Sequence, residues 1–296
     1  MSDENVESTS APLIEHLAEL RNRLIHSAIA FIIGMIICFT VWNPIFNFLT
    51  NPIRDALLEL GQEPELIMIK LQEGFLVAIK ISLLGGFILS FPYIGFQLWR
   101  FVAPGLYKQE QGAFLPFLLA SPLMFFLGAA FAFYVVTPLA FSFFLGFQQL
   151  GGSGVEAVDG AETLGDIGIT FQGSVAEYLS LTIKFIVAFG LCFQLPVLLT
   201  LMGKAGLVSA EGLRGVRKYA VVGILVLAAV VTPPDVITQI ILFVVVYGLY
   251  EMSIQLVKMV EKQREERLRA EGYYDDEDDT DEDKIVDDLG VEWDDD

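Results

Sequence analysis

Long apolar runs constrain the fold of this chain more than any other feature. A helix that crosses a membrane needs about 20 mostly apolar residues, and lipid offers no partner for its backbone polar groups. The chain is 54% hydrophobic, with a mean hydropathy of +0.58. We therefore expect an all-α, polytopic membrane protein with six transmembrane helices. The six runs span residues 24–42, 75–99, 114–141, 179–202, 219–231 and 236–250.

The last two runs are shorter than a full membrane crossing. Thr232, Pro233, Pro234 and Asp235 separate them, and this sequence favours a turn because proline interrupts a helix and restricts the residue before it. We expect a hairpin of two short spans, accommodated by local thinning of the bilayer or by burial against neighbours. The alternative, one kinked helix, would place the C-terminal tail outside.

Prolines lie in or at the ends of the other runs, where each one removes a backbone donor and favours a kink. Kinked helices can splay, so we predict a cup-shaped bundle. The prolines concerned are Pro92, Pro116, Pro122, Pro138 and Pro196.

The positive residues are distributed unevenly between the two predicted faces. Lysine and arginine accumulate in cytoplasmic segments. The face opposite to the main group holds Arg54 and Lys70, with Lys80 and Lys184 near the starts of spans. The sequence thus predicts that both termini are cytoplasmic and that the loop carrying Pro52 is outside. The main group comprises Arg21, Arg23, Arg100, Lys108, Lys204, Arg214, Arg217, Lys218, Lys258, Lys262, Arg264, Arg267 and Arg269.

Both ends of the chain differ in composition from the membrane domain, which we place at residues 13–257. Residues 1–12 are predicted to be a flexible polar N-terminus. Residues 258–296 form a charged tail, in which 271–296 contain 15 acidic residues and one lysine. Such a segment buries too little apolar surface to offset the entropy of ordering. We expect disorder from about residue 272.

An amphipathic helix is predicted directly before the first span, because apolar and polar residues alternate there with helical spacing. We expect it to run along the cytoplasmic interface into the membrane. Glu19 stands four residues before Arg23, which favours an intrahelical ion pair. The apolar face comprises Leu13, Ile14, Leu17, Leu20 and Leu24, and the other face comprises Glu15, His16, Glu19, Asn22 and Arg23.

Features of an enzyme or metalloprotein are missing from the sequence. The only two histidines lie near the N-terminus, and Cys38 and Cys192 lie in apolar runs without metal-ligand spacing. We find no catalytic motif and no phosphate-binding loop, and predict no enzymatic activity, metal, cofactor or nucleic-acid partner. Hydropathy alone leaves open a six-span secondary transporter of small solutes, although no internal repeat is evident.

Three groups of residues form recognisable motifs. The first group is the segment His16-Leu-Ala-Glu-Leu-Arg-Asn-Arg-Leu24 and the third is Thr232-Pro-Pro-Asp235. The second group comprises residues 92–97 with Trp99, Phe101, Pro104, Gly105, Leu106, Tyr107, Lys108 and Glu110. Taken together, these groups resemble the TatC family, the six-span core subunits of the twin-arginine protein translocase. The resemblance covers about residues 13–256.

The resemblance implies a receptor in the bacterial cytoplasmic (inner) membrane. It implies that the protein binds twin-arginine signal peptides and supports export of folded proteins, driven by the proton-motive force. The key carboxylates fall on Glu19 and Glu110, and a carboxylate suits the planar fork of a guanidinium better than it suits a lysine. The other residues assigned to this site are Arg21, Phe101, Pro104, Leu106 and Tyr107.

The resemblance also implies a multimeric complex in lipid with single-span partners of the TatA and TatB types, packed against the last two spans. Many relatives carry glutamate where this chain has Gln194, which cannot ionise. A role that requires charge there is therefore in doubt. The residues assigned to partner contact are Thr232, Pro233, Pro234, Asp235, Gln239 and Gln194.

Overall fold

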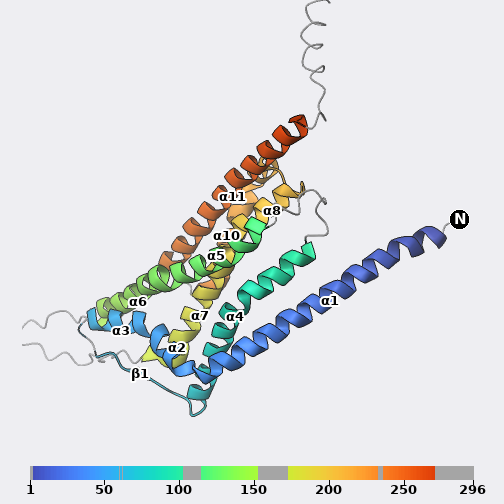
Figure 1. Ribbon diagram of the computed structural model, residues 1–296. Helices are drawn as coiled ribbons and strands as arrows, with labels where there is room; N and C mark the ends of the chain where they lie inside the picture. The colour runs from blue at the N-terminus through green and yellow to red at the C-terminus, as the bar shows by residue number, and fades with distance from the viewer. Residues whose placement is uncertain are drawn as a thin grey trace, which may run out of the picture.

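The protein is a bundle of long helices, and a computed structural model describes its residues 3–59, 61, 63–102, 115–152, 173–232 and 236–270. The three longest helices are α1 (Asp3–Thr40), α4 (Glu73–Val102) and α11 (Val236–Ala270). Helix α1 is continuous, so it joins the predicted interfacial segment to the first apolar run. The described chain ends, at the start of α1 and the end of α11, lie at the same end of the bundle (Figure 1).

Two rods of the bundle are built from more than one helix. Helices α5 (Leu115–Phe131) and α6 (Thr137–Gly152) are joined by the π-helix η3 (Ala132–Val136). At this junction the Thr137 hydroxyl donates to the Ala132 carbonyl at 2.8 Å, and Pro138 lacks an N–H. Helices α7 (Val175–Cys192) and α8 (Leu195–Lys204) are separated by a turn at residues 193–194, and Pro196 is the second residue of α8.

Short elements occupy the end of the bundle opposite to the chain ends (Figure 1). These are α2 (Trp42–Leu49), α3 (Asn51–Glu59) and the parallel pair of β1 (Leu66–Ile67) with β2 (Gly173–Ser174). The buried Glu73 carboxylate fastens this end, because it accepts hydrogen bonds from the Ile69 N–H at 2.7 Å and from the Ala176 N–H at 3.0 Å. Pro52, predicted to lie in a loop, is buried within α3.

The last part of the described chain is a helical hairpin. Helix α9 (Ala210–Gly215) leads into α10 (Arg217–Val231), and α11 follows after residues 233–235, which lie outside the described ranges. Helix α10 has 15 residues, in agreement with a short predicted span. Helix α11 has 35 residues and continues to Ala270, well past the predicted end of its apolar run at residue 250.

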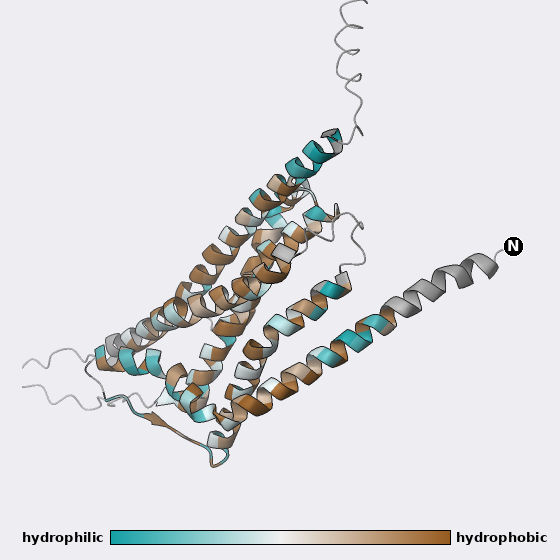
Figure 2. Cartoon of the chain, viewed as in Figure 1, coloured by the Kyte–Doolittle hydropathy of each residue, from teal (hydrophilic) through white to brown (hydrophobic). Residues whose placement is uncertain are grey.

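Five stretches of the described helices are long and apolar enough to cross a membrane. They are Leu17–Thr40, Glu73–Leu98, Phe117–Gly146, Val175–Lys204 and Val236–Arg267. Figure 2 shows apolar residues along the middle of the bundle and polar residues toward the end of α11 and in the described N-terminal part of α1. The chain is therefore a polytopic helical membrane protein.

Glycines allow the helices to approach closely. A Cβ atom on Gly128 of α5 would lie 2.6 Å from the Phe189 carbonyl oxygen of α7, and one on Gly190 would lie 2.6 Å from the Phe125 ring. A Cβ atom on Gly86 of α4 would lie 2.6 Å from the Met35 nitrogen of α1. Small residues at such crossings are typical of membrane helices, because packing and not the hydrophobic effect holds them together.

Candidate functional site

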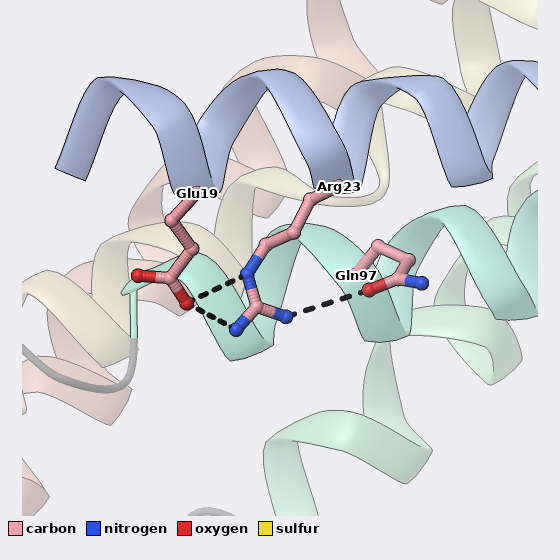
Figure 3. A network of polar contacts seen from close by, with 3 residues as sticks. All are labelled: Glu19, Arg23 and Gln97. Atoms are coloured by element: carbon pink, nitrogen blue, oxygen red, sulfur yellow. Dashed lines mark hydrogen bonds and ion pairs between the residues drawn. The ribbon is translucent and has the colours of Figure 1, made fainter. Parts of the chain in front are cut away.

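The Glu19 carboxylate binds an arginine of its own helix. Arg23 Nε donates to Glu19 Oε1 at 3.0 Å, and Arg23 Nη2 donates to the same oxygen (Figure 3). The two residues lie one turn apart on α1, the spacing at which helical side chains meet. The predicted intrahelical ion pair is confirmed.

Helix α4 adds a third member, Gln97, to this cluster. Arg23 Nη1 donates to Gln97 Oε1 at 3.4 Å, and Gln97 Nε2 donates to the Tyr93 hydroxyl at 2.7 Å. Gln97 is buried, and Figure 3 shows its side chain meeting the guanidinium from the side opposite to Glu19. The cluster thus presents a carboxylate and an amide oxygen to one guanidinium.

Sequence reasoning assigned no role to Gln97 or Tyr93. Both lie in the segment 92–97, which formed part of the family resemblance, but nothing in their spacing pointed to Arg23, 74 residues away from Gln97. Among the other residues assigned to this site, Arg21 is exposed and Phe101 is half-buried near the end of α4.

The remaining members of the predicted peptide site lie outside the described residues. They are Pro104, Leu106, Tyr107 and Glu110, all within 103–114. The pairing of Glu19 with Glu110 therefore stays a prediction.

The residues assigned to partner contact fall in two places. Thr232 is buried at the end of α10, where its hydroxyl donates to the Ala228 carbonyl at 2.9 Å, and Gln239 is half-buried near the start of α11. Gln194 instead lies at the break between α7 and α8. Pro233, Pro234 and Asp235 are outside the described residues.

The Gln194 amide makes two hydrogen bonds to a single residue of α5. Its Oε1 accepts from the Ser121 hydroxyl at 2.8 Å, and its Nε2 donates to the Ser121 carbonyl at 2.9 Å. The amide therefore supplies an additional donor to the Ser121 carbonyl, a backbone acceptor of α5. This neutral amide joins α5 to the junction of α7 and α8.

An apolar groove of about 640 Å³ lies between α7 and α10. Its walls include Val187 and Leu191 of α7 and Leu227, Val230 and Val231 of α10. The groove therefore reaches the residue next to Thr232, at the tip of the helical hairpin. No cluster of three or more metal-binding side chains occurs among the described residues.

Comparison of the sequence with protein families gives one match that covers most of the chain. Residues 15–244 match the family described as "Sec-independent protein translocase protein (TatC)". The TatC protein of Magnetococcus marinus is 45% identical over 261 residues, which cover 88% of this chain and 89% of that protein. The TatC protein of Escherichia coli K12 is 36% identical over 250 residues, covering 84% and 89%.

The fold is similar to that of a solved structure as well. The crystal structure described as the twin arginine translocase receptor TatC superposes with a TM-score of 0.69 at 41% identity, covering 83% of this chain and 99% of that one. These matches leave the small-solute transporter alternative without support.

Proposed function

Because the chain belongs to the TatC family of Sec-independent protein translocase proteins, we propose that it binds the paired arginines of a signal peptide through Glu19 and Glu110. This proposal rests on the contact between the Arg23 guanidinium and the Glu19 carboxylate. The Glu19 carboxylate already binds a guanidinium through two nitrogens. Two guanidinium nitrogens on one carboxylate form a charge-assisted contact that a lysine cannot reproduce.

The proposed topology has six spans, with both termini in the cytoplasm of a bacterium whose inner membrane holds the protein. The positions of the described chain ends at one end of the bundle support it (Figure 1). Helix α10, with 15 residues, would be about 22 Å long, against a hydrocarbon core of about 30 Å. Local thinning of the bilayer would accommodate this short fifth span.

The proposed transport step uses no nucleotide. The apolar part of the signal peptide would lie along the kinked, cup-shaped bundle, where it gains from leaving water, and the proton-motive force would drive export of the folded cargo. TatA-type and TatB-type single-span partners would pack near Thr232 and Gln239. The groove between α7 and α10 supports that position, because it is apolar and adjoins the hairpin tip.

Peptide binding by purified protein in nanodiscs tests whether Glu19 and Glu110 bind the paired arginines. Glu19→Ala and Glu110→Ala should each weaken binding of a twin-arginine peptide about tenfold or more, because a contact to a charged group is worth about 1.5–3 kcal/mol. A peptide with two lysines in place of the arginines should bind wild type poorly and respond less to either change. Wild-type affinity in both variants, at matched protein levels and moderate salt, would show that the two carboxylates do not bind the paired arginines.

A further inference from the structure

Arg23 occupies the carboxylate that the proposed function assigns to the signal peptide. The Arg23 side chain is 16% exposed, whereas the Glu19 side chain is 36% exposed. The internal guanidinium is therefore more deeply seated than the carboxylate that it contacts. Both of its contacts to Glu19 use the single oxygen Oε1.

The contacts of Arg23 also differ from those of an ordinary surface pair. Exposed ion pairs along one helix are weak because both side chains remain mobile and solvated. Here the third guanidinium nitrogen reaches Gln97 of the neighbouring helix, and Tyr93 accepts a hydrogen bond from the amide of Gln97. The guanidinium is held from two helices at once, as Figure 3 shows.

We propose that Arg23 is a built-in competitor of the signal peptide, and this inference rests on the proposed function of Glu19. An incoming guanidinium can form the same fork on Glu19 Oε1 only after Arg23 has moved away. The peptide then binds to the fraction of molecules in which Glu19 is released, so the measured affinity is lower than the intrinsic affinity by that fraction.

This competition acts on ligands in proportion to their use of Glu19. The free energy needed to release Arg23 opposes every ligand that replaces Arg23 on the Glu19 carboxylate, but not a ligand that binds without this contact. A protein without the competitor should therefore bind the twin-arginine peptide more tightly, and the lysine peptide, which depends less on Glu19, should gain less.

The experiment measures peptide affinity for full-length variants in nanodiscs. Arg23→Gln should tighten binding of the twin-arginine peptide by about three- to fivefold, and binding of its lysine counterpart less. Arg23→Lys keeps the charge but loses the fork, so it should give a smaller gain. Gln97→Met loosens the hold on Arg23 without changing Glu19 or Arg23, and should also give a smaller gain. Lys258→Gln, an exposed position on α11 with the same change in net charge, is the matched control and should bind as wild type does.

A second comparison separates this inference from the proposed function. In a Glu19→Ala background, Arg23→Gln should have no further effect, because the two changes act on one contact. Suppose that Glu19→Ala weakens peptide binding but Arg23→Gln and Gln97→Met leave it unchanged or weaken it. This result would show that Arg23 does not compete with the peptide, while the role of Glu19 in peptide binding would stand. If Glu19→Ala itself has no effect on peptide binding, the proposed role of Glu19 is wrong, and the inference about Arg23 no longer applies.

Discussion

Helix α1 and the α7–α8 rod are about equally apolar but are packed very differently. Their most apolar windows have mean hydropathies of 1.9 and 2.2, yet 11% of the window in α1 is buried inside the bundle against 56% in α7–α8. Lipid solvates apolar side chains as well as a protein interior does. Hydropathy therefore shows which segments enter the membrane, and specific contacts decide which of them form the core.

The contacts of the two regions explain this difference. Helix α7 buries Phe185 and Phe189 completely, and the neighbouring Phe125 stacks on Phe91 of α4 with ring centroids 3.7 Å apart. Helix α1 instead meets α4 at the crossing of Gly34 and Gly86 and through the cluster around Arg23. We expect substitutions in the first region to unfold the bundle and substitutions in the second to detach one helix.

The largest effect is expected from Gly128→Ala. The new methyl group would meet the Phe189 carbonyl oxygen at 2.6 Å, and α7, packed from several sides, has no room to retreat. We expect a loss of about 3 kcal/mol in the free energy of unfolding, measured by denaturant titration in detergent. The control is Gly248→Ala on α11, where no described atom lies within 4 Å of the added carbon. Equal stability of the two variants would show that the α5–α7 contact is not tight.

Gly86→Ala should have a smaller effect on stability and a larger one on geometry. Its methyl group would meet the Met35 nitrogen at 2.6 Å, but lipid on the far side of α1 lets that helix shift. We expect a loss of about 1–2 kcal/mol and a longer distance between spin labels at Leu17 and Leu98. Gly223→Ala, with no described atom within 4 Å of its added carbon, should leave the distance unchanged. An unaltered distance in Gly86→Ala would mean that α1 is fixed by other contacts.

The smallest effect is expected from Gln194→Leu. The change removes both hydrogen bonds to Ser121, and interhelical hydrogen bonds in membranes contribute about 0.6 kcal/mol on average and about 1.7 at most. Unfolding should therefore become easier by about 1 kcal/mol. Gln194→Glu places a carboxylate beside the Ser121 carbonyl and should destabilise the protein more than leucine does. If leucine destabilised the protein more than glutamate does, the two hydrogen bonds between the Gln194 amide and Ser121 would not be what stabilises this junction.

The sequence was sufficient to predict the helical membrane fold and the local part of the site. The apolar runs correspond to α1, α4, α5–α6, α7–α8, α10 and α11, because each run is long and continuous. The pair of Glu19 with Arg23 was predictable because both residues lie on one helix, where spacing fixes geometry. The count of six spans stays a prediction, since α10 is shorter than a usual span.

Contacts between helices were not predictable in the same way. Gln97 meets Arg23 across 74 residues, and a helix surrounded by lipid carries little periodicity to show which face packs inward. The connection after the first run was predicted as a loop, but it contains α2 and α3, whose short and partly polar sequences give no membrane signal. The hydrogen bond from the Ala176 N–H to the Glu73 carboxylate joins residues 103 positions apart and was missed for the same reason.

The glycine crossing of α1 and α4 gives Glu19 the geometry of a lever. Glu19 stands 15 residues before Gly34 on one continuous helix, which places it about 22 Å from the crossing. A tilt of about 10° at this pivot would carry the carboxylate by about 4 Å, whereas a binding site tolerates about 0.5 Å. Any force that changes the angle between α1 and α4, including a change in bilayer thickness, therefore acts directly on the Glu19 carboxylate.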